Sequence, residues 1–325
     1  MKTVKIGQLD KPVSRMGLGT WAIGGGSAWG GDKDKAESIA TIRKAPELGV
    51  NLIDTAPGYN FGTSERIVGE ALQGMDRDKI IIITKFGVVW DREGSLFNKV
   101  NGRQLYWNLS RESILDEIDK SLERLGVDYI DVYMSHWQSV EPYYTPIRDT
   151  MEVLNELKAQ GKIKAIGAAN VSPAQVEEYL KWGSLDIVQA KYSVLDRAVE
   201  DELLPICREN NVVLQAYSPL EMGLLTGALP RDYKPVGAQI PKKWFQPENL
   251  PRVFDYLDKL QPLTEKYQCS IADINMAWIL AQGEKVVLLS GATTADQISQ
   301  NVRSTEIELE ADDVAYIREL AEALD

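Results

Sequence analysis

The chain has 325 residues, of which 44% are hydrophobic and 26% are charged, a composition typical of globular proteins with one large domain or two ordinary ones. Its formal net charge of −12 predicts repulsion from nucleic acids and from anionic membrane surfaces, so we expect neither as a partner. No apolar run approaches the roughly 18–20 residues that a membrane span needs.

The N-terminus and the cysteines favour a cytoplasmic location. The stretch from Met1 to Ile6 lacks the apolar core of a secretory signal. Cys207 and Cys269 lie far apart and form no CxxC pair, which is typical of a protein in a reducing compartment. His136 is the only histidine, so we expect no zinc site and no other metal centre.

Short β-rich runs alternate with longer amphipathic runs along the whole chain. A hairpin pairing Lys2–Ile6 with residues near Val13 is expected first. The predicted strands are Met16–Gly19, Asn51–Ala56, Lys79–Thr84, Tyr129–Met134, Ile163–Gly167, Asp186–Ala190, Val212–Ala216 and Lys285–Leu289. Between them lie helical patterns such as Glu112–Leu125, in which the apolar residues mark one face.

Eight strand–helix repeats in a chain of this size predict a (β/α)8 TIM barrel, an α/β fold formed here by one domain spanning residues 1–325. The hairpin would cap the barrel bottom. A doubly wound open sheet is the alternative, but it would usually place a glycine-rich dinucleotide turn after the first strand. Gly17-Leu18-Gly19 lacks the third glycine and leads into Ala22–Lys33, which is interpreted as a flexible connector.

Three long loops are predicted after strands, at Phe86–Leu109, Gln138–Pro146 and Leu220–Pro251. In a barrel these loops gather at the C-terminal face, where barrel enzymes keep their sites. Loops of this length commonly form lids or binding walls.

Four residues that carry chemistry, Asp54, Tyr59, Lys85 and His136, fall just after consecutive predicted strands. Each has an ordinary interpretation on its own: a turn cap, a packed ring, a surface ion pair or a core histidine. Because the ends of neighbouring strands meet in a parallel barrel, the four side chains are expected to converge on one pocket.

The four side chains form a chemically consistent set. An ammonium from Lys85, held by Asp54, is expected to lower the pKa of the Tyr59 phenol from its usual value near 10. His136 would then orient a substrate carbonyl oxygen. Such a site has a proton donor but no nucleophile, so it needs hydride from a nicotinamide cofactor.

Long, spaced motifs resemble those of the aldo-keto reductase family over nearly the whole chain. The first runs from Asp54-Thr55-Ala56-Pro57-Gly58-Tyr59 to Gly62, Ser64-Glu65 and Gly69. Others are Leu125–Val132 leading to His136-Trp137, Gly161–Gly167 with Asn170, and Tyr217-Ser218-Pro219-Leu220. The resemblance implies a (β/α)8 barrel and a catalytic tetrad of Asp54, Tyr59, Lys85 and His136.

The resemblance also implies a cofactor site. Asn170 and Gln189 would bind the nicotinamide carboxamide, Tyr217 would stack on its ring, and Asp54 would lie beside it. The approach to the nicotinamide would be lined by Gly19, Thr20 and Trp21. Ser218, Leu220, Gly223 and Leu225 would meet the pyrophosphate, and Gly291, Thr293, Gln297 and Asn301 the adenosine end. The helix that begins near Ala295 would offer its N-terminus to an anion.

Departures from the family pattern leave the choice of cofactor open. Ala169 replaces a serine and Gln300 a glutamate. Thr293 and Thr294 stand where relatives commonly carry Lys or Arg that hold the 2′-phosphate of NADPH. We therefore expect weak selectivity for NADPH, with NADH also usable, unless Arg303 or Lys234 compensates.

The segments after the strands are rich in aromatic residues, of which Trp21, Trp29, Trp90 and Trp137 are the predicted substrate contacts. Flat rings with polar edges suit sugars, polyols or small aldehydes, although such rings could equally pack loops onto the barrel. The Phe86–Leu109 insertion resembles that of bacterial branches that act on small aldehydes and sugar-derived carbonyls.

These features predict an NAD(P)H-dependent reductase of aldehyde and ketone carbonyls, present as a monomer or small homo-oligomer. One alternative is a non-catalytic regulator resembling the β-subunits of potassium channels. Another is an isomerase or aldolase that uses Lys85 as a Schiff-base amine, which would require a lysine without a carboxylate partner.

Overall fold

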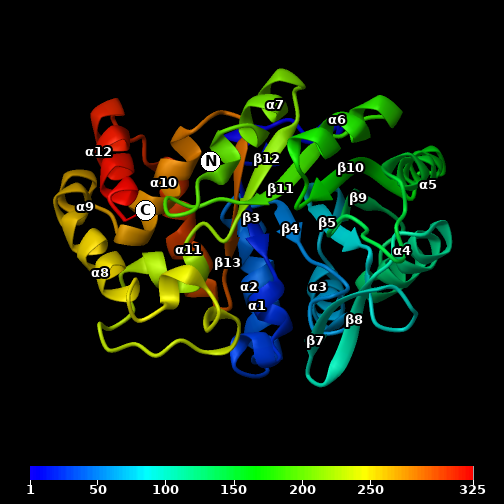
Figure 1. Cartoon of the computed structure of the whole chain (residues 1–325), viewed down its shortest axis with the longest axis horizontal. Helices are drawn as coiled ribbons and strands as arrows, with labels where there is room; N and C mark the ends of the chain where they lie inside the picture. The colour runs from blue at the N-terminus through cyan, green and yellow to red at the C-terminus, as the bar shows by residue number, and fades with distance from the viewer. Residues whose placement is uncertain (325) are drawn as a thin grey trace.

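A closed barrel of eight parallel strands forms the centre of the computed structural model, which describes residues 1–324 (Figure 1). The order around the barrel is β3-β4-β5-β9-β10-β11-β12-β13, with β13 pairing back to β3. The strands are β3 (Met16–Gly19), β4 (Leu52–Asp54), β5 (Ile81–Phe86), β9 (Ile130–Ser135), β10 (Ile163–Ala169), β11 (Ile187–Lys191), β12 (Val213–Tyr217) and β13 (Val286–Gly291). The barrel is confirmed over the doubly wound sheet.

Both faces of the barrel strands are buried, as β5 illustrates. Ile81 and Ile83 belong to an apolar cluster inside the barrel, whereas Ile82 and Phe86 belong to the larger cluster between strands and helices. Because successive side chains of a strand point to opposite faces, Lys85 shares the inward face with Ile81 and Ile83. The alternation places a charged side chain inside the barrel.

Helices surround the barrel (Figure 1). The amphipathic helix α4 begins after Ser110, whose side chain accepts from the Ser113 N–H, and ends at Gly126 with a φ of 64°. The α-helices are α1 (Trp21–Gly24), α2 (Lys35–Glu47), α3 (Thr63–Leu72), α4 (Arg111–Leu125), α5 (Ile147–Ala159), α6 (Pro173–Trp182), α7 (Leu203–Glu209), α8 (Leu250–Lys259), α9 (Gln261–Tyr267), α10 (Ile271–Ala281), α11 (Ala295–Val302) and α12 (Ala311–Glu322).

The predicted strands are all present, but most of them end later than expected. The strand predicted at Lys79–Thr84 is Ile81–Phe86, because Asp76 caps a 3-10 turn that contains Lys79. The strand predicted at Asn51–Ala56 is shorter, Leu52–Asp54. Lys85 therefore lies within β5 and not after it, and Asp54 is the last residue of β4.

A two-stranded hairpin closes the bottom of the barrel, as predicted. β1 (Thr3–Val4) pairs with β2 (Val13–Ser14) in antiparallel register. Ile6, Leu9 and Val13 pack into the apolar cluster inside the barrel. The hairpin thus seals the end opposite the carboxyl ends of the strands.

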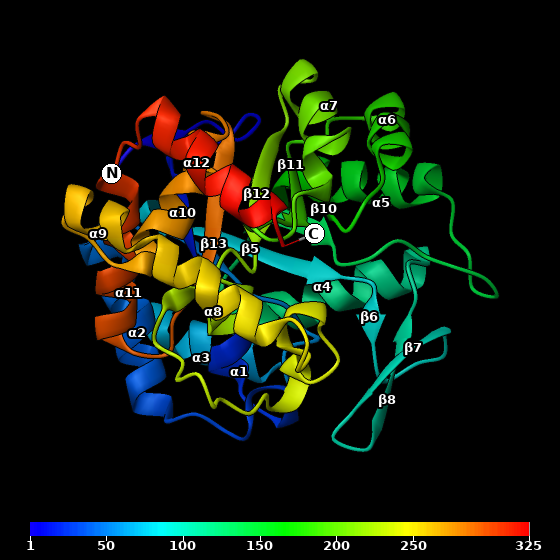
Figure 2. The ribbon, with the colours of Figure 1, turned by 60° about the vertical axis from the view of Figure 1, so that its left-hand side comes forward.

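The insertion expected as a loop at Phe86–Leu109 is instead a small antiparallel sheet, which we call the flap (residues 88–107). Its strands are β6 (Val88–Val89), β7 (Ser95–Val100) and β8 (Arg103–Trp107), and Figure 2 shows the β7–β8 hairpin projecting from the barrel. Cross-strand hydrogen bonds from Arg103–Trp107 to both neighbours explain why this stretch is ordered.

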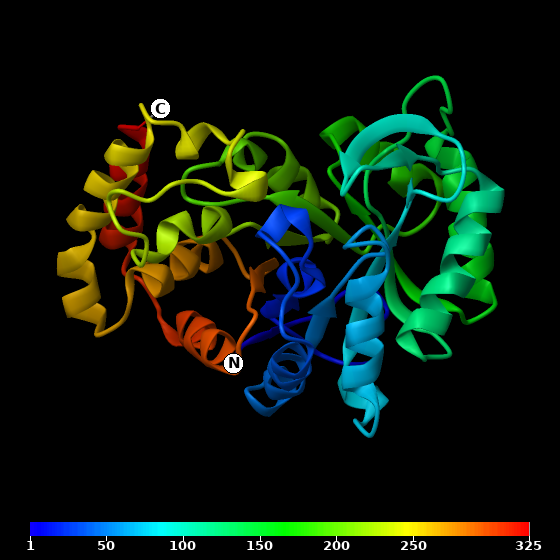
Figure 3. The same cartoon turned by 90° about the horizontal axis from the view of Figure 1, so that it is seen from below.

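Two further segments are more structured than expected. The Ala22–Lys33 connector contains most of α1 and a 3-10 turn, Ser27–Trp29. The stretch at Leu220–Pro251 contains three 3-10 turns, the first at Glu221–Thr226, and already includes the start of α8. Viewed from below, this yellow segment and the cyan flap lie on opposite sides of α1 (Figure 3). Residues 138–146 form no regular element, as predicted.

Among residues 1–324, none of the helices combines the length and the apolarity that crossing a membrane would require.

Candidate active site

The four predicted catalytic residues come together at the carboxyl ends of three neighbouring strands. Asp54 is the last residue of β4, Lys85 lies inside β5, and His136 directly follows β9. Tyr59 lies in the turn that leads from β4 into α3. β4 pairs with β5 and β5 with β9, so the barrel places the four side chains side by side.

A chain of short polar contacts joins three of the four residues. Lys85 Nζ donates to Asp54 Oδ1 at 2.6 Å and to the carbonyl oxygen of Thr55 at 3.0 Å. The same ammonium lies 3.3 Å from the Tyr59 hydroxyl oxygen. Asp54 and Lys85 are both fully buried, so the pair is shielded from water. The expected pairing of Asp54 with Lys85 is confirmed.

One expectation about these contacts is wrong: the ammonium of Lys85 does not lower the pKa of Tyr59. Burial of the phenol, together with the negative charge of Asp54, raises the pKa of Tyr59 well above its usual value of 10. Asp54 offsets part of the charge of the Lys85 ammonium, so burial determines the direction in which the pKa of Tyr59 moves. Tyr59 consequently keeps its proton.

His136 is held as a neutral imidazole. Burial and the nearby charge of Lys85 lower the pKa of His136 well below its usual value of 6.5. Its ring lies edge-on to the Tyr59 ring, with centroids 5.7 Å apart. Among residues 1–324 no group bonds to the buried Nδ1 atom of His136. A neutral imidazole beside a protonated phenol can present hydrogen-bond donors to one oxygen.

The residues predicted to hold the nicotinamide surround the tetrad. Gln189 donates through Nε2 to Asp54 Oδ2 at 2.8 Å, and Tyr217 donates through its hydroxyl to Asn170 Oδ1 at 2.8 Å. Asn170 in turn donates to the carbonyl oxygen of His136 at 3.0 Å. These bonds tie Gln189 and Asn170 directly to the tetrad, and Tyr217 to it through Asn170.

Trp21 and Thr20 lie between β3 and the tetrad. The Trp21 ring lies 6.2 Å from the Tyr59 ring at an interplanar angle of 31°. Thr20 is fully buried, and its hydroxyl donates to the carbonyl oxygen of Asp54 at 2.8 Å. Thr20 therefore supports the backbone of Asp54, while Gly19 pairs with Asp54 across the β3–β4 ladder.

The stretch predicted to meet the pyrophosphate has an unusual backbone. Ser218, Glu221, Met222 and Gly223 all have positive φ angles, a region that residues other than glycine rarely adopt. A side chain at Gly223 would meet no atom within 4 Å, so this backbone faces open space. Leu220 is partly exposed and Leu225 fully buried, so Leu225 can face a ligand only through its backbone.

The residues predicted for the adenosine end lie along α11 and in the segment before it. Thr294 caps this helix, and its side chain accepts from the Gln297 N–H. Gln297 Oε1 accepts from both the N–H (2.8 Å) and the hydroxyl (3.1 Å) of Thr293. Asn301 donates to Ser290 Oγ at 3.0 Å. At the exposed Gly291, a side chain would meet only the Gly19 carbonyl oxygen, at 3.9 Å.

Taken together, these groups fit a nicotinamide dinucleotide: open space above the backbone at Gly223 and Gly291, a helix N-terminus at α11, and polar groups bonded to the tetrad. Of the suggested compensating cations, Arg303 follows the last residue of α11 and donates to the carbonyl oxygen of Gln268 at 3.1 Å. Arg303 is thus held at the C-terminal end of α11, whereas Thr293 lies before its N-terminus.

Sequence reasoning did not identify the anchor of the pyrophosphate stretch. Glu221 is 3% exposed, accepts from Ser193 Oγ at 2.6 Å, and pairs with Lys191 Nζ at 3.0 Å. Lys191 also donates to Asp196 at 2.8 Å. A buried, paired carboxylate holds the strained backbone around Met222 in place. One acidic residue within an otherwise apolar stretch was the signal in the sequence.

Two other buried carboxylates support β5 from outside the barrel. Glu65 accepts from Thr84 Oγ1 at 2.6 Å, next to Lys85. Glu117 of α4 accepts from the backbone N–H of Gly87 at 3.0 Å and from Ser113 Oγ at 3.0 Å. Burial raises the pKa of Glu117 to about 8. The sequence showed Glu65 within the first motif but indicated no role for it.

The predicted substrate tryptophans separate into two groups. Trp29 packs edge-on against Trp21 with centroids 5.1 Å apart, and Trp21 in turn lies beside Tyr59. Trp137, the residue after His136, packs against Trp107 of the flap with ring centroids 6.3 Å apart. Trp90 packs against Phe61 at 5.5 Å, a contact between the flap and the turn before α3.

The geometry contradicts the Schiff-base alternative, because Lys85 is fully buried and paired with Asp54.

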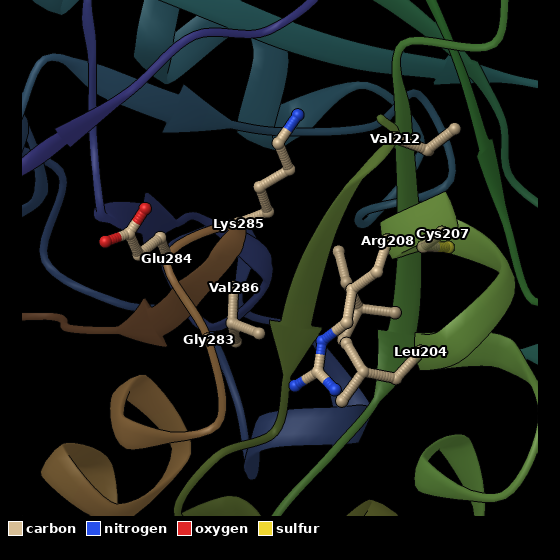
Figure 4. Close-up of a pocket in the computed structure, with 9 residues that line it drawn as sticks. Leu204, Cys207, Arg208, Val212, Gly283, Glu284, Lys285 and Val286 are labelled. Atoms are coloured by element: carbon tan, nitrogen blue, oxygen red, sulfur yellow. The ribbon is translucent and has the colours of Figure 1, made fainter. Parts of the chain in front are cut away.

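A separate pocket of about 300 Å³ lies between α7, β12 and β13 (Figure 4). Arg208, Lys285 and Cys207 line it near the first residues of β12 and β13, whereas the tetrad lies at the carboxyl ends of the strands. Burial raises the pKa of the Cys207 thiol to about 12, so this pocket offers no ready nucleophile.

The profile of the aldo/keto reductase family matches residues 15–322. An NADH-specific methylglyoxal reductase of Escherichia coli (strain K12) is 58% identical over 325 residues, covering 100% of both chains. The aldo-keto reductase YhdN of Bacillus subtilis (strain 168) is 36% identical, covering 99% of this chain and 94% of its own.

Solved structures agree with this sequence relationship. The glycerol dehydrogenase AKR11B4 from Gluconobacter oxydans superposes with a TM-score of 0.88 at 32% identity, covering 99% of this chain and 95% of its own. The holo form of the aldo-keto reductase AKR11C1 from Bacillus halodurans superposes with a TM-score of 0.80 at 29% identity, covering 99% and 97%.

Proposed function

This chain belongs to the aldo/keto reductase family, and from that premise we propose that it reduces a small 2-oxoaldehyde with NADH, using Tyr59 as the proton donor. The reaction class is that of the family, NAD(P)H-dependent reduction of aldehyde and ketone carbonyls. The reductases and dehydrogenase among the relatives favour this class over a non-catalytic regulator. The single observation that carries the proton-donor assignment is the contact of 3.3 Å between Lys85 Nζ and the Tyr59 hydroxyl.

The cofactor, when bound, supplies hydride to the carbonyl carbon and is oxidised, while the carbonyl oxygen takes a proton. Tyr59 provides that proton from a phenol whose pKa is raised by burial. An alkoxide oxygen is a stronger base than a phenolate, so the transfer is favourable in this direction. The Lys85 ammonium then stabilises the phenolate left behind, an interaction formed only as the reaction proceeds.

His136 has the complementary role of holding the carbonyl oxygen. A neutral imidazole carries one N–H, and the buried Nδ1 atom has no acceptor among residues 1–324. We therefore place the proton on Nε2, where it can donate to the substrate oxygen. Asn170 fixes the backbone of His136, and Tyr217 fixes Asn170.

The carboxamide of the nicotinamide would be held by Gln189 and Asn170, with Tyr217 against its ring. Gly19, Thr20 and Trp21 would border the ring, and the stretch 218–225 would meet the pyrophosphate. Thr293, which precedes α11, and Gln297 and Asn301 of that helix would take the adenosine. No step of the chemistry depends on these groups moving a proton; they bind and orient.

The choice of a 2-oxoaldehyde and of NADH is supported by one relative, by two threonines and by three tryptophans. The methylglyoxal reductase that is 58% identical over the full chain is named as NADH-specific. Thr293 and Thr294 can donate hydrogen bonds but cannot neutralise a 2′-phosphate. Trp21 and Trp29 near Tyr59, and Trp137 after His136, would form apolar walls for a small substrate.

We also propose that residues 1–325 act as one domain in the cytoplasm, as a monomer or a small homo-oligomer. The cysteines Cys207 and Cys269 are free thiols, which suits a reducing compartment. Sedimentation analysis of the purified protein measures the oligomeric state directly.

The function is tested by assaying methylglyoxal reduction with each cofactor for the wild type and Tyr59→Phe. We expect the substitution to lower kcat by at least about a hundredfold, the scale of a lost general acid. NADH binding, measured by quenching of tryptophan fluorescence, should be unchanged. Near-normal turnover by Tyr59→Phe would refute the proton donor, and a hundredfold preference for NADPH would refute the proposed cofactor.

A further inference from the structure

The polar contacts at the tetrad continue across the inside of the barrel to a residue that the proposed mechanism does not use. Gln189 Nε2 donates to Asp54 Oδ2 at 2.8 Å and also to Gln215 Oε1 at 2.8 Å. Gln189 on β11 and Gln215 on β12 are register partners on neighbouring strands. A continuous chain thus runs from Gln215 through Gln189, Asp54 and Lys85 to Tyr59.

Gln215 lies inside the barrel, where an apolar residue would be the simpler filling. It is fully buried, two residues after Val213, which belongs to the apolar cluster inside the barrel. Its Nε2 atom has no hydrogen-bond partner among residues 1–324. Because an unpaired buried donor costs stability, packing alone does not explain a glutamine here.

The barrel leaves room for this side chain at one glycine. A Cβ atom added at Gly17 of β3 would lie 3.4 Å from Gln215 Nε2 and 2.9 Å from a methyl carbon of Leu52. The absence of a side chain at Gly17 therefore lets Gln215 and Leu52 share the interior of the barrel.

The bonds determine which way round the Gln189 amide lies. A side-chain amide has two N–H donors and one oxygen acceptor. Asp54 Oδ1 is occupied by Lys85, so Oδ2 and Gln215 Oε1 are the two acceptors that face the Gln189 nitrogen. A reversed amide would set its oxygen against both of these oxygens. With Asp54 alone, one N–H of Gln189 would have no acceptor and the amide would be held at a single point.

We propose that Gln215 is a positioning residue for cofactor binding: it locks the Gln189 amide so that both N–H groups point inward and the amide oxygen stays available to the nicotinamide carboxamide. The inference rests on the proposed function, in which Gln189 binds that carboxamide. Gln215 acts only through Gln189.

The first test replaces Gln215 with Met, which keeps a similar volume but removes both polar atoms. We expect the Kd and the KM for NADH to rise about fivefold, the loss of one ordinary hydrogen bond. The kcat for methylglyoxal should change less than about threefold. Gln215→Glu, which is expected to stay protonated and keeps an acceptor oxygen, should stay within about twofold of the wild type in all three constants.

A pH profile separates positioning from a merely structural role. Burial raises the pKa of Asp54, while the charge and hydrogen bond of Lys85 and the hydrogen bond from Gln189 lower it in part. When Gln189 is loosened in Gln215→Met, this pKa should rise, and the acid limb of kcat/KM should move to higher pH. Thr150→Val serves as the control, because the Thr150 hydroxyl is also buried and unpaired but lies on α5. It should leave the Kd for NADH and the profile unchanged.

A double-mutant cycle with Gln189→Met decides between the remaining outcomes. If Gln215 acts through Gln189, the double variant binds NADH no more weakly than Gln189→Met alone. If Gln189→Met weakens NADH binding but Gln215→Met does not, or if the two effects are additive, the inference about Gln215 is wrong. If Gln189→Met leaves NADH binding unchanged, the proposed cofactor role of Gln189 fails, and the inference fails with it.

Discussion

Tyr59 keeps its proton because the ammonium beside it already has a partner. Lys85 Nζ lies 2.6 Å from the Asp54 carboxylate but 3.3 Å from the phenol oxygen, so the ammonium interacts more strongly with the carboxylate. Burial then raises the pKa of Tyr59 instead of lowering it. A proton donor needs this protonated state, and the charge of Lys85 contributes once the phenolate forms.

His136 offers a clean measurement because it is the only histidine in the chain. Its pKa is held well below 6.5 in the folded protein, so below pH 6.5 the unfolded chain binds the extra proton first. Folding stability is therefore fully present above pH 6.5 and decreases as the pH falls. Between pH 7.5 and 5.5 we expect the free energy of unfolding of His136→Asn to fall by about 1 kcal/mol less than that of the wild type.

The measurement is urea unfolding at both pH values, with the wild type and the variant compared at each pH. Other titrating groups cancel in the difference between the two proteins. Equal losses of stability in His136→Asn and the wild type would show that the histidine is not held neutral.

At the scale of elements, two buried acidic side chains connect helices to β5, the strand that carries Lys85. Glu117 on α4 accepts from the Gly87 N–H, at the turn where β5 leads into the flap. Glu65 on α3 accepts from Thr84 of the same strand. The two contacts hold Thr84 and Gly87, on either side of Lys85. The helices therefore help to position Lys85 as well as covering the barrel.

Glu117 gives the strand–helix contact a pH dependence. Its pKa is about 8 when folded and near 4.5 when unfolded, so between these values the folded state holds a proton that the unfolded state loses. Stability due to this group is present below pH 4.5 and declines as the pH rises towards 8. As the pH rises from 5 to 7, we expect the free energy of unfolding of Glu117→Gln to increase relative to that of the wild type, by on the order of 1 kcal/mol per pH unit.

Thermal or urea unfolding across that range checks the expectation. Glu112→Gln is the matched control, since Glu112 lies on the same helix with its side chain exposed. A difference between Glu117→Gln and the wild type that is constant with pH would contradict a raised pKa.

At the scale of the whole molecule, a net charge of −12 has to be reconciled with an anionic cofactor. Local groups must do the binding, since the overall field repels anions. In the proposed site these are neutral groups: the stretch 218–225 for the pyrophosphate, and the helix α11 with the residues before it for the adenosine end. The threonines at 293 and 294 add no positive charge for a second phosphate group.

Thr293→Arg should therefore improve NADPH use. A cation there can form a charge-assisted bond to the 2′-phosphate, so we expect the KM for NADPH to fall about tenfold while that for NADH changes little. Gln160→Arg adds the same charge at the end of α5 and should change neither constant. If both variants improve NADPH use equally, the limit is the net charge and not the missing local cation.

Strand periodicity predicted the barrel because parallel strands buried on both faces leave long apolar runs in the sequence. The tetrad followed from residue spacing, since inward positions on neighbouring strands converge whatever the exact strand ends. The flap at 88–107 was missed, because its strands pair only with one another and lack a continuous apolar pattern.

By itself, the amino-acid sequence determined the family, the barrel, and which four side chains meet at the carboxyl ends of the strands, because these depend on local periodicity and on long motifs. Only the tertiary structure decided the protonation states and the supporting contacts. The pKa of Tyr59 depends on burial and on Asp54, five residues away in the chain. The bond between Gln189 and Gln215 depends on two strands meeting side by side, a distance in space that no spacing along the chain records.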